Sequence, residues 1–292
     1  MNPAGIRAPL FVPMSRPERV PKAAASGADA VILDLEDSVP PADKGAARDA
    51  LASGFTDVPV IVRVNGVGTP WHVEDLAAVR RLRFAALMLP KAESRATLAQ
   101  VAEELQGHVA LIALVETARG LAEARGLAAV PGVARLAFGS VDFCADLGCA
   151  HRREVLLPAR SELVLASRLS GIAGPLDGIT AAVEDAALVA SDARHARDLG
   201  MTGKLCIHPR QVPEVLRAFA PSEAEVAWAR RVLASGDGVA TVDGEMVDEP
   251  VRRRARATLA RAGEGGSHGW PTRGGLARMP PDGPSGPEGN DA

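Results

Sequence analysis

Val31-Ile-Leu-Asp-Leu-Glu-Asp-Ser38 is the stretch that decides the fold of this 292-residue chain. Its first half is apolar and partly β-branched, which predicts a strand that is covered on both faces. Asp34, Glu36 and Asp37 then arrive at or just past the end of that strand. Carboxylates are costly to bury unless they are paired, hydrogen-bonded or close to a metal. Three of them here indicate a functional site, although a strand end that dips into solvent and caps the next helix would look the same.

The same pattern, a short apolar strand followed by an amphipathic helix, recurs eight times over about 210 residues. Eight such units predict an α/β fold, a (β/α)₈ TIM barrel over residues 1–220. A doubly wound open sheet is the alternative, but it rarely needs eight repeats and usually carries a Gly-rich turn after its first strand. Pro13-Met-Ser-Arg-Pro17 is not such a turn. The strands are expected at residues 10–13, 30–35, 59–65, 85–91, 109–116, 135–142, 175–180 and 203–209.

Residues 221–262 lie outside the eight units and are expected to form a C-terminal arm. It should contain a helix over about residues 224–235, a hairpin around Asp243-Gly244, and a basic helix from Pro250 to near Arg261. The arm is either a lid on its own barrel or an extension onto a neighbouring subunit. Residues 263–292 hold almost no apolar side chains, so we expect a disordered tail there.

Composition narrows the class of protein. The formal net charge, 33 − 36 = −3, does not indicate nucleic-acid binding. No apolar run approaches the roughly 20 residues of a membrane span, and the first residues lack the apolar core of a signal peptide. The three cysteines, Cys144, Cys149 and Cys206, form no metal-binding pattern, and so sparse a set suits a reducing compartment. We therefore expect a cytoplasmic protein without nucleic-acid or membrane partners.

Polar side chains gather where the predicted strands end. In a barrel of this kind the active site lies at that face, among the loops that follow the strands. A single such residue could be structural, but surface charges would scatter around the helices instead of collecting at one end. The set consists of Arg16, Asp34, Glu36, Asp37, Arg63, Asn65, Lys91, Glu116, Asp142, Lys204 and His208.

Glu116 and Asp142 are the candidate metal ligands, because each ends an apolar strand and the two strands are expected to be adjacent. Oxygen ligands without cysteine or paired histidine favour Mg²⁺ over zinc. The alternative is that both acids cap the following helices, but Thr117 could cap the helix after Glu116. Arg63 would complete a site for an anionic substrate, since its guanidinium can bind a carboxylate at two points.

Seven segments, taken together, resemble one enzyme family. The resemblance is to the HpcH/HpaI aldolase/citrate lyase family, and within it to the citrate lyase beta-subunit-like CoA-ester lyases, which include malyl-CoA and citramalyl-CoA lyases. It covers about residues 8–260 and is much less specific for the substrate than for the family. In chain order the segments are Phe11-Val-Pro-Met-Ser-Arg-Pro17 with Lys22, Leu33-Asp-Leu-Glu-Asp-Ser38, Val62-Arg-Val-Asn65, Leu89-Pro-Lys91, Val115-Glu-Thr117, Phe138-Gly-Ser-Val-Asp-Phe143 and Ile207-His-Pro209.

The resemblance implies a TIM barrel and reversible, Mg²⁺-dependent cleavage of a 3-hydroxyacyl-CoA, with Mn²⁺ as an alternative metal. Glu116 and Asp142 fall on the family's metal ligands. Arg63 falls on the arginine that holds the keto acid and stabilises the enolate. Glu36 and Asp37 match an acidic pair that orders metal-bound water and this arginine, which leaves Asp34 with a structural role.

The resemblance also assigns the CoA-binding side. Phe11, Arg16 and Lys22 match residues that line the CoA channel, and Ile207-His208-Pro209 matches the segment packed along the pantetheine arm. The implied partners are a CoA thioester and a small keto acid, such as glyoxylate, pyruvate or oxaloacetate. Met14 departs from the pattern, because many relatives have Gly or Ala there, and a larger side chain could narrow the CoA entrance.

The arm carries one more match. Gly244-Glu-Met-Val-Asp248 resembles a Gly-x-Met-Ile-Asp motif of family members whose C-terminal arm covers a neighbouring barrel. The resemblance implies that Asp248 acts there as general acid and base, and that the protein is a homotrimer or a hexamer. The alternative from the sequence is that Asp248 caps the helix begun by Pro250, and the two roles are compatible.

Three hypotheses for function follow. The first is a Mg²⁺-dependent CoA-ester lyase that acts on a substrate such as citramalyl-CoA, malyl-CoA or citryl-CoA. The second is a metal-dependent aldolase for CoA-free 2-keto-3-deoxy acids, against which the CoA-facing residues and the arm argue. The third is a non-catalytic subunit that binds CoA esters, which the intact set of acids disfavours.

Overall fold

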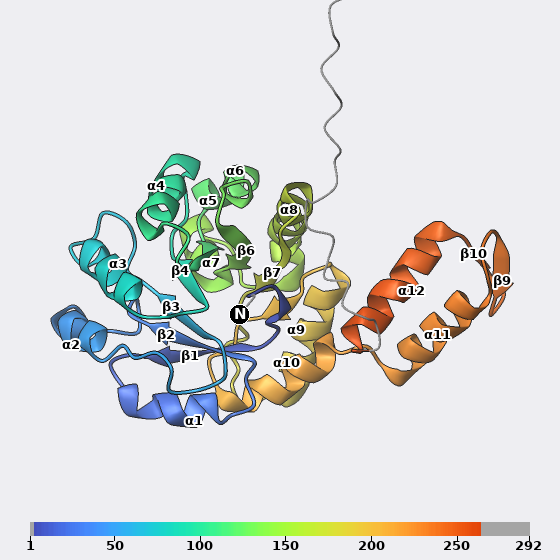
Figure 1. Cartoon of the computed structure of the whole chain (residues 1–292), viewed down its shortest axis with the longest axis horizontal. Coiled ribbons are helices and arrows are strands. Elements are labelled where there is room, and N and C mark those ends of the chain that lie inside the picture. Colours follow the sequence, from blue (N-terminus) through green and yellow to red (C-terminus); the bar gives the residue numbers. More distant parts are fainter. Residues whose placement is uncertain (1–2, 264–292) are drawn as a thin grey trace, which may run out of the picture.

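The computed structural model describes residues 3–263, and its main body is a barrel of eight parallel strands in chain order (Figure 1). Hydrogen bonds between the start of the chain and its eighth strand close the barrel: Lys204 N–H donates to Arg7 O and Phe11 N–H donates to Cys206 O. The (β/α)₈ prediction is confirmed. The strands are β1 Pro9–Pro13, β2 Ala30–Asp34, β3 Val60–Arg63, β4 Ala86–Leu89, β5 Ala110–Val115, β6 Val133–Phe138, β7 Ala173–Asp177 and β8 Gly203–Lys204.

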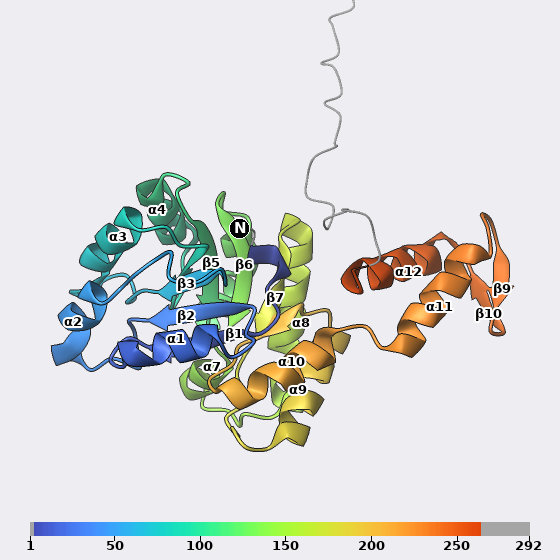
Figure 2. The ribbon, with the colours of Figure 1, turned by 60° about the horizontal axis from the view of Figure 1, so that its bottom comes forward.

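Helices cover the outside of the barrel (Figures 1 and 2). Within residues 3–263, none of the helices is both long enough and apolar enough to cross a membrane. The barrel helices are α1 Val20–Ala24, α2 Lys44–Asp49, α3 His72–Arg81, α4 Arg95–Leu105, α5 Ala118–Ala122, α6 Ala124–Ala128, α7 Ser140–Leu147, α8 Arg153–Ser170, α9 Ala186–Asp198 and α10 Val212–Phe219. Short 3₁₀ turns lie at Pro3–Gly5, Pro17–Arg19, Pro41–Asp43 and Pro209–Gln211.

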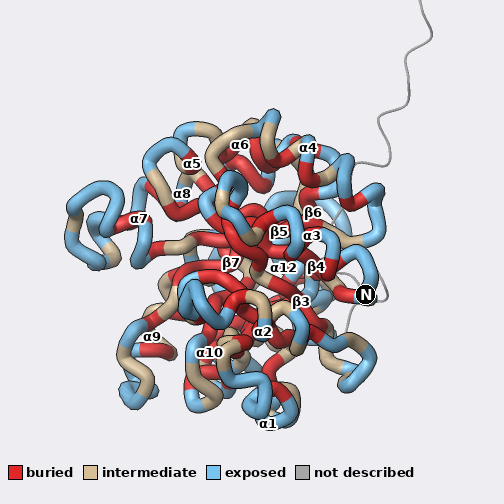
Figure 3. Tube along the Cα trace, turned by 90° about the vertical axis from the view of Figure 1, so that its left-hand side faces the viewer, coloured by how far each residue is buried: buried red, intermediate tan, exposed pale blue. Residues whose placement is uncertain are grey.

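The core has two layers, and buried residues follow the strands through its centre (Figure 3). On β2, Val31 and Leu33 belong to the layer between strands and helices, whereas Ala30 and Ile32 belong to the cluster inside the barrel. Because successive strand side chains alternate between faces, Asp34 continues the inner row above Ile32. The same alternation turns Arg63 inward above Ile61. The top of the barrel interior is therefore polar.

The ends of two strands differ most from their predicted positions. The sixth strand stops at Phe138, because Gly139 leaves the strand and α7 begins at Ser140. Asp142 consequently lies in the first turn of α7, not at a strand end. The eighth strand contains two residues instead of seven, and beyond it Cys206 forms only a single bridge to Leu10.

Residues beyond α10 form an arm that projects away from the barrel (Figure 2). It consists of α11 Glu223–Ala234, the hairpin β9 Ala240–Val242 and β10 Glu245–Val247, and α12 Glu249–Arg261. Asp243 and Gly244 both have positive φ angles, as the predicted two-residue turn requires. The arm has a small core of its own, made by Ala229, Val232, Val247 and Ala255. The division at residue 221 stays a prediction, and the predicted tail, apart from residue 263, lies outside the described residues.

Candidate active site

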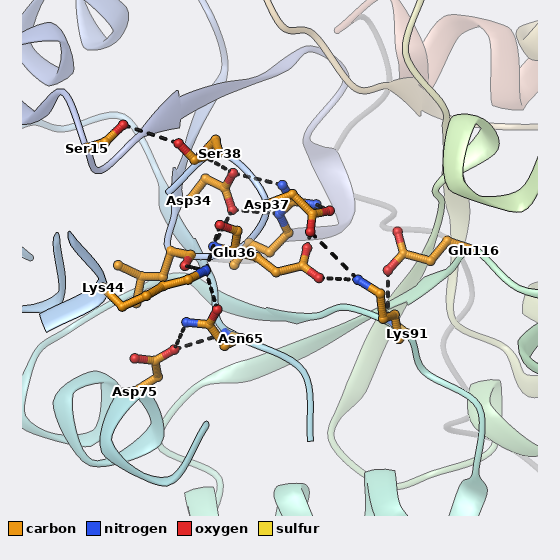
Figure 4. Close-up of polar contacts among 12 residues, drawn as sticks. Ser15, Asp34, Glu36, Asp37, Ser38, Lys44, Asn65, Asp75, Lys91 and Glu116 are labelled. Carbon is orange, nitrogen blue, oxygen red and sulfur yellow. Dashed lines mark hydrogen bonds and ion pairs between the residues drawn. The ribbon is translucent and has the colours of Figure 1, made fainter. Parts of the chain in front are cut away.

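Arg63 contacts three acidic residues at the polar face of the barrel, and Figure 4 shows these acids, Asp34, Glu36 and Asp37, close together. Arg63 ends β3, and its register partner on β2 is Asp34. The Asp34 carboxylate binds the guanidinium at two points, with 2.7 Å from Nε to Oδ1 and 2.8 Å from Nη2 to Oδ2. Oε2 of Glu36 lies 2.9 Å from Nη1. The Phe11 ring packs on the same guanidinium, with 4.9 Å from its centre to Cζ. Arg63 is thus held on several sides.

Charge and burial act against each other in this cluster. Burial would raise the pKa of Asp34, but the hydrogen bonds and charge of Arg63 bring that pKa below its usual value. Burial also raises the pKa of Glu36, and here Arg63 and Lys91 do not fully offset it. Asp37 is more exposed and lies 3.9 Å from Nη1 of Arg63. Asp34 is therefore the closest anionic partner of the arginine. From the sequence alone, only a structural role was expected for Asp34.

Glu116 follows β5 and is almost fully buried, with 1% of its surface exposed. Its Oε1 accepts a hydrogen bond of 2.7 Å from the backbone N–H of Lys91, whereas its Oε2 has no hydrogen-bond partner among the described residues. Burial, followed by the charge of Glu36, raises the pKa of Glu116 to about 8. Gly139 lines this oxygen so closely that a Cβ at that position would collide with the carboxylate. A buried carboxylate oxygen that has no hydrogen-bond partner fits a metal ligand.

Asp142 is exposed on α7, and its negative charge contributes to the raised pKa of Glu116. The two acids are therefore near enough to interact, although Asp142 reaches the site from a helix. Within residues 3–263, no three or more His, Cys, Asp or Glu side chains gather closely enough to hold a metal. Two carboxylates fit Mg²⁺, which commonly takes one or two and keeps water and substrate oxygens as its other ligands.

Lys91 connects the arginine cluster to Glu116. Its ammonium pairs with Glu36, its backbone N–H binds Glu116, and its own φ angle is positive at 49°. The sequence placed Lys91 among the polar strand ends but not among the site residues. Its position at the end of the fourth predicted strand indicates neither its positive φ nor its contact with Glu116.

A second layer of buried polar residues supports Glu36 from behind. The Lys44 ammonium donates to the carbonyls of Leu35 and Glu36, at 2.8 Å each, and to Oδ1 of Asn65. Asn65 in turn donates twice to Asp75 of α3. Lys44 and Asp75 were not predicted, because their own positions look like ordinary helix surface. A cavity of about 570 Å³ opens beside this layer and the Glu36–Lys91 pair.

The predicted CoA-facing residues lie on and after β1 and in the segment that follows β8. Phe11 donates its N–H to Cys206 O, which brings β1 next to the segment Ile207-His208-Pro209. Ile207 is exposed, and His208 caps the short turn that follows it. Arg16 and Lys22 are exposed in the loop and helix after β1. Met14, by contrast, is buried in the layer under the helices, so it does not narrow this side.

Asp248 is not part of this cluster within one chain. It is the N-cap of α12, where its Oδ1 accepts the N–H of Val251 at 3.2 Å. The arm that carries it projects away from the barrel (Figures 1 and 2). The capping alternative is therefore observed, and a site that combines Asp248 with Glu116 requires a second chain or a different placement of the arm.

Comparison with known proteins shows the family in which this arrangement of residues occurs. Residues 7–209 match the HpcH/HpaI aldolase/citrate lyase family. The chain belongs to this family. It is 41% identical to a citrate lyase subunit beta-like protein of Mycobacterium tuberculosis, over 87% of this chain and 95% of that protein. It is 35% identical to a (3S)-malyl-CoA thioesterase of Cereibacter sphaeroides, over 88% and 94%.

Solved structures agree with the fold. A crystal structure of CitE from M. tuberculosis, in complex with magnesium, acetoacetate and coenzyme A, superposes with a TM-score of 0.79 at 40% identity. The match covers 89% of this chain and all of that one. Family membership confirms the resemblance seen in the sequence and identifies the chain as an enzyme of a carbon–carbon lyase family.

Proposed function

We propose that this protein is a Mg²⁺-dependent CoA-ester lyase that reversibly cleaves a 3-hydroxyacyl-CoA to a keto acid and an acyl-CoA. The observation that carries the proposal is the unpartnered, buried Oε2 of Glu116 beside the guanidinium cluster of Arg63. These groups provide a place for a cation and a place for a carboxylate. The M. tuberculosis structure that contains magnesium, acetoacetate and coenzyme A supports the same combination of ligands.

Glu116 and Asp142 would hold the metal, with Mn²⁺ as an alternative to Mg²⁺. When bound, the cation would act as a Lewis acid toward the keto or hydroxyl oxygen of the substrate. Glu116 can serve only as a carboxylate, so its proton must leave on binding. Gly139 is required beside it, because any larger residue would occupy the space of the Glu116 carboxylate.

Arg63 would bind the acidic end of the substrate and stabilise the negative charge that develops as the carbon–carbon bond breaks. Asp34 uses one N–H of Nε and one of Nη2, and Glu36 lies against Nη1. Among residues 3–263 the remaining N–H groups make no hydrogen bond, so they can donate to substrate oxygens. Because Asp34 fixes the plane of the guanidinium, those donors are oriented before the substrate arrives.

Proton transfer at the acyl carbon is assigned to Asp248 of a neighbouring subunit. In cleavage it would protonate the enolate of acetyl- or propionyl-CoA, and in condensation it would remove that proton. The projecting arm supports this assignment, since the barrel of the same chain lies away from it. A homotrimer, or a hexamer of two trimers, would supply the neighbour.

The remaining assignments concern CoA. Arg16 and Lys22 would meet its phosphates, whereas Phe11 and Ile207-His208-Pro209 would line the pantetheine arm. Both groups lie on the β1–β8 side of the barrel mouth, so one extended ligand could contact them together. The three cysteines are free, which accords with the cytoplasmic location that we also propose.

One second candidate comes from a relative: the C. sphaeroides protein is named as a thioesterase, so hydrolysis of the CoA thioester is the main alternative. The two reactions leave different products. Cleavage of the carbon–carbon bond releases a keto acid and keeps the thioester, whereas hydrolysis releases a free CoA thiol and no keto acid.

The test is to incubate the protein with Mg²⁺ and citramalyl-CoA, malyl-CoA or citryl-CoA, and to measure keto acid and free thiol in the same samples. Keto acid in excess of thiol, abolished by EDTA and in Asp248→Asn, supports the lyase. Release of free thiol without keto acid would show that the protein is a thioesterase and not a lyase. Cleavage of CoA-free acids alone favours the aldolase hypothesis, and tight binding without turnover favours the non-catalytic subunit.

A further inference from the structure

Lys91 has a backbone conformation that side-chain-bearing residues rarely adopt. Within residues 3–263, the only non-glycine residues with a positive φ are Lys91, Gln106 and Asp243. Gln106 ends helix α4 and Asp243 sits in the hairpin turn, where such angles are common. Lys91 instead follows a buried barrel strand, directly at the polar face. An unusual φ at that place is a reason to look for a function.

The conformation redirects one N–H group. β4 and β5 are paired in register up to Leu89 and Ala113, and Ala92 N–H returns to the carbonyl of Leu114. Between them, the N–H of Lys91 leaves this ladder and donates to Oε1 of Glu116 at 2.7 Å. The N–H of Lys91 therefore binds the side chain of Glu116 instead of a backbone carbonyl.

The same hydrogen bond decides which oxygen of Glu116 is available. Oε1 is occupied by Lys91, so the unpartnered Oε2 is the atom left for a cation. Gly139, between β6 and α7, fits closely against the carboxylate. Gly120 of α5 packs so tightly on the Ala92 carbonyl that a Cβ there would collide with it, which keeps the loop in place. Glu116 is thus confined between two backbone segments.

We infer that Lys91 is a positioning residue whose left-handed backbone, not its ammonium, orients Glu116 for metal binding. The inference rests on the proposed metal site and names a residue that sets its geometry. A carboxylate whose rotamer is fixed in advance loses less entropy when it binds a cation, which is how outer-layer hydrogen bonds raise metal affinity.

The ammonium of Lys91 should lower metal affinity, whereas its backbone should raise it. Its positive charge lies near Glu116, as the electrostatic coupling of the two groups indicates, and would repel a bound cation. Losing only this charge should leave metal affinity unchanged or raise it. Variants that all lack the ammonium but differ in their tolerance of positive φ therefore isolate the backbone contribution.

The test compares Lys91→Gly and Lys91→Asn, which accept a positive φ, with Lys91→Ala and Lys91→Val, which resist it. The dissociation constant of Mn²⁺ is measured by electron paramagnetic resonance, with circular dichroism to confirm that each variant is folded. We expect Gly and Asn to bind Mn²⁺ at least as tightly as the wild type. Val should bind about tenfold more weakly, and Ala should fall between.

Equal affinity of the Gly and Val variants would overturn the inference, as would weakening in Gly and Asn equal to that in Val. If Lys91→Val does not fold, the Ala and Gly pair decides by the same criterion. If the wild type binds Mn²⁺ but cleaves no CoA ester, the proposed function is refuted. The Lys91 variants would then still decide whether Lys91 positions Glu116. A wild type that binds no Mn²⁺ would overturn both.

Discussion

The carboxylate of Asp34 and the guanidinium of Arg63 form a two-point contact across adjacent strands, with distances of 2.7 and 2.8 Å. The two residues are register partners at the ends of β2 and β3. Both side chains point into the barrel, so their contact follows from strand pairing and alternation alone. This geometry makes Asp34 the main partner of the arginine proposed to bind substrate, ahead of Glu36 and Asp37.

Replacement of Asp34 by Asn should lower activity strongly while leaving the metal site intact. The change keeps the shape of the side chain but removes the charge that orients Arg63. We expect kcat/KM for the CoA ester to fall about 100-fold, or roughly 3 kcal/mol, and the Mn²⁺ dissociation constant to stay within a factor of about three. Asp37→Asn is the matched control, because that carboxylate is exposed, and it should change kcat/KM by at most about fivefold. Equal losses in both variants would contradict the assignment.

The metal-free protein should lose stability as pH rises from about 5 to 8. In the folded state the pKa of Glu116 is raised to about 8 by burial, from a usual value of 4.5. Between these values the folded state keeps a proton that the unfolded state has released, so unfolding becomes easier with rising pH. The penalty is absent below about pH 4.5 and complete above about pH 8, at about 1.4 kcal/mol per pH unit at most.

Urea unfolding in EDTA at pH 5.5 and 8.0 measures this dependence. Glu116→Gln is neutral throughout, so its stability should change less between the two pH values than that of the wild type. Mg²⁺ added at pH 8.0 should stabilise the wild type and not the variant, because the cation binds the ionised carboxylate. An identical pH dependence in both proteins would show that Glu116 is not the responsible group.

Part of this architecture was predictable from the sequence, because it depends on local patterns. Eight alternations of strand and helix predicted the barrel, and the position of Arg63 and Glu116 at strand ends predicted that they lie at the same face of it. Asp142 was placed at a strand end, but Gly139 ends the strand earlier and transfers the acid to α7. The proximity of the acids follows from tertiary structure, not from strand spacing.

Other parts depend on contacts between distant segments, which no local pattern encodes. Lys44 reaches Asn65 across 21 positions, and Lys91 reaches Glu36 across 55. Each residue alone resembles a solvated helix or loop lysine. The positive φ of Lys91 could not be predicted either, because no glycine or turn motif marks the position and the associated hydrogen bond joins it to a residue 25 positions away.

A buried ionic cluster between β7, β8 and α8 should contribute to the free energy of unfolding and not to the reaction. Asp177 is fully buried and pairs with Arg160, at 2.7 Å to Nε, and with Lys204, at 2.9 Å to Nζ. Asp177→Asn leaves two buried cations without their anion, so we expect a loss of about 3–5 kcal/mol in the free energy of unfolding. Lys204→Met leaves one balanced pair and should cost less. Urea unfolding of both variants measures the order, and the reverse order would contradict this account.

Asp248 should act across subunits, and subunit mixing can show it. Asp248→Asn is the suitable variant, because Asn caps a helix about as well as Asp and so preserves the start of α12 while removing the acid. Glu116→Gln disables the barrel of its own chain but keeps the arm. Each variant alone should be inactive.

Coexpressed with different tags and purified as mixed oligomers, the two variants should recover activity only if the arm serves a neighbour. Every mixed trimer then has one of its three sites where a barrel that keeps Glu116 meets an arm that keeps Asp248, so purified mixed trimers should show about a third of wild-type activity. An arm that folds back on its own barrel gives none, since no single chain carries both residues. Asp248→Ala, which also removes the cap, should in addition lower the melting temperature, because an N-cap contributes about 1 kcal/mol. If Asp248→Asn is about as active as the wild type, Asp248 only caps α12 and does not transfer a proton.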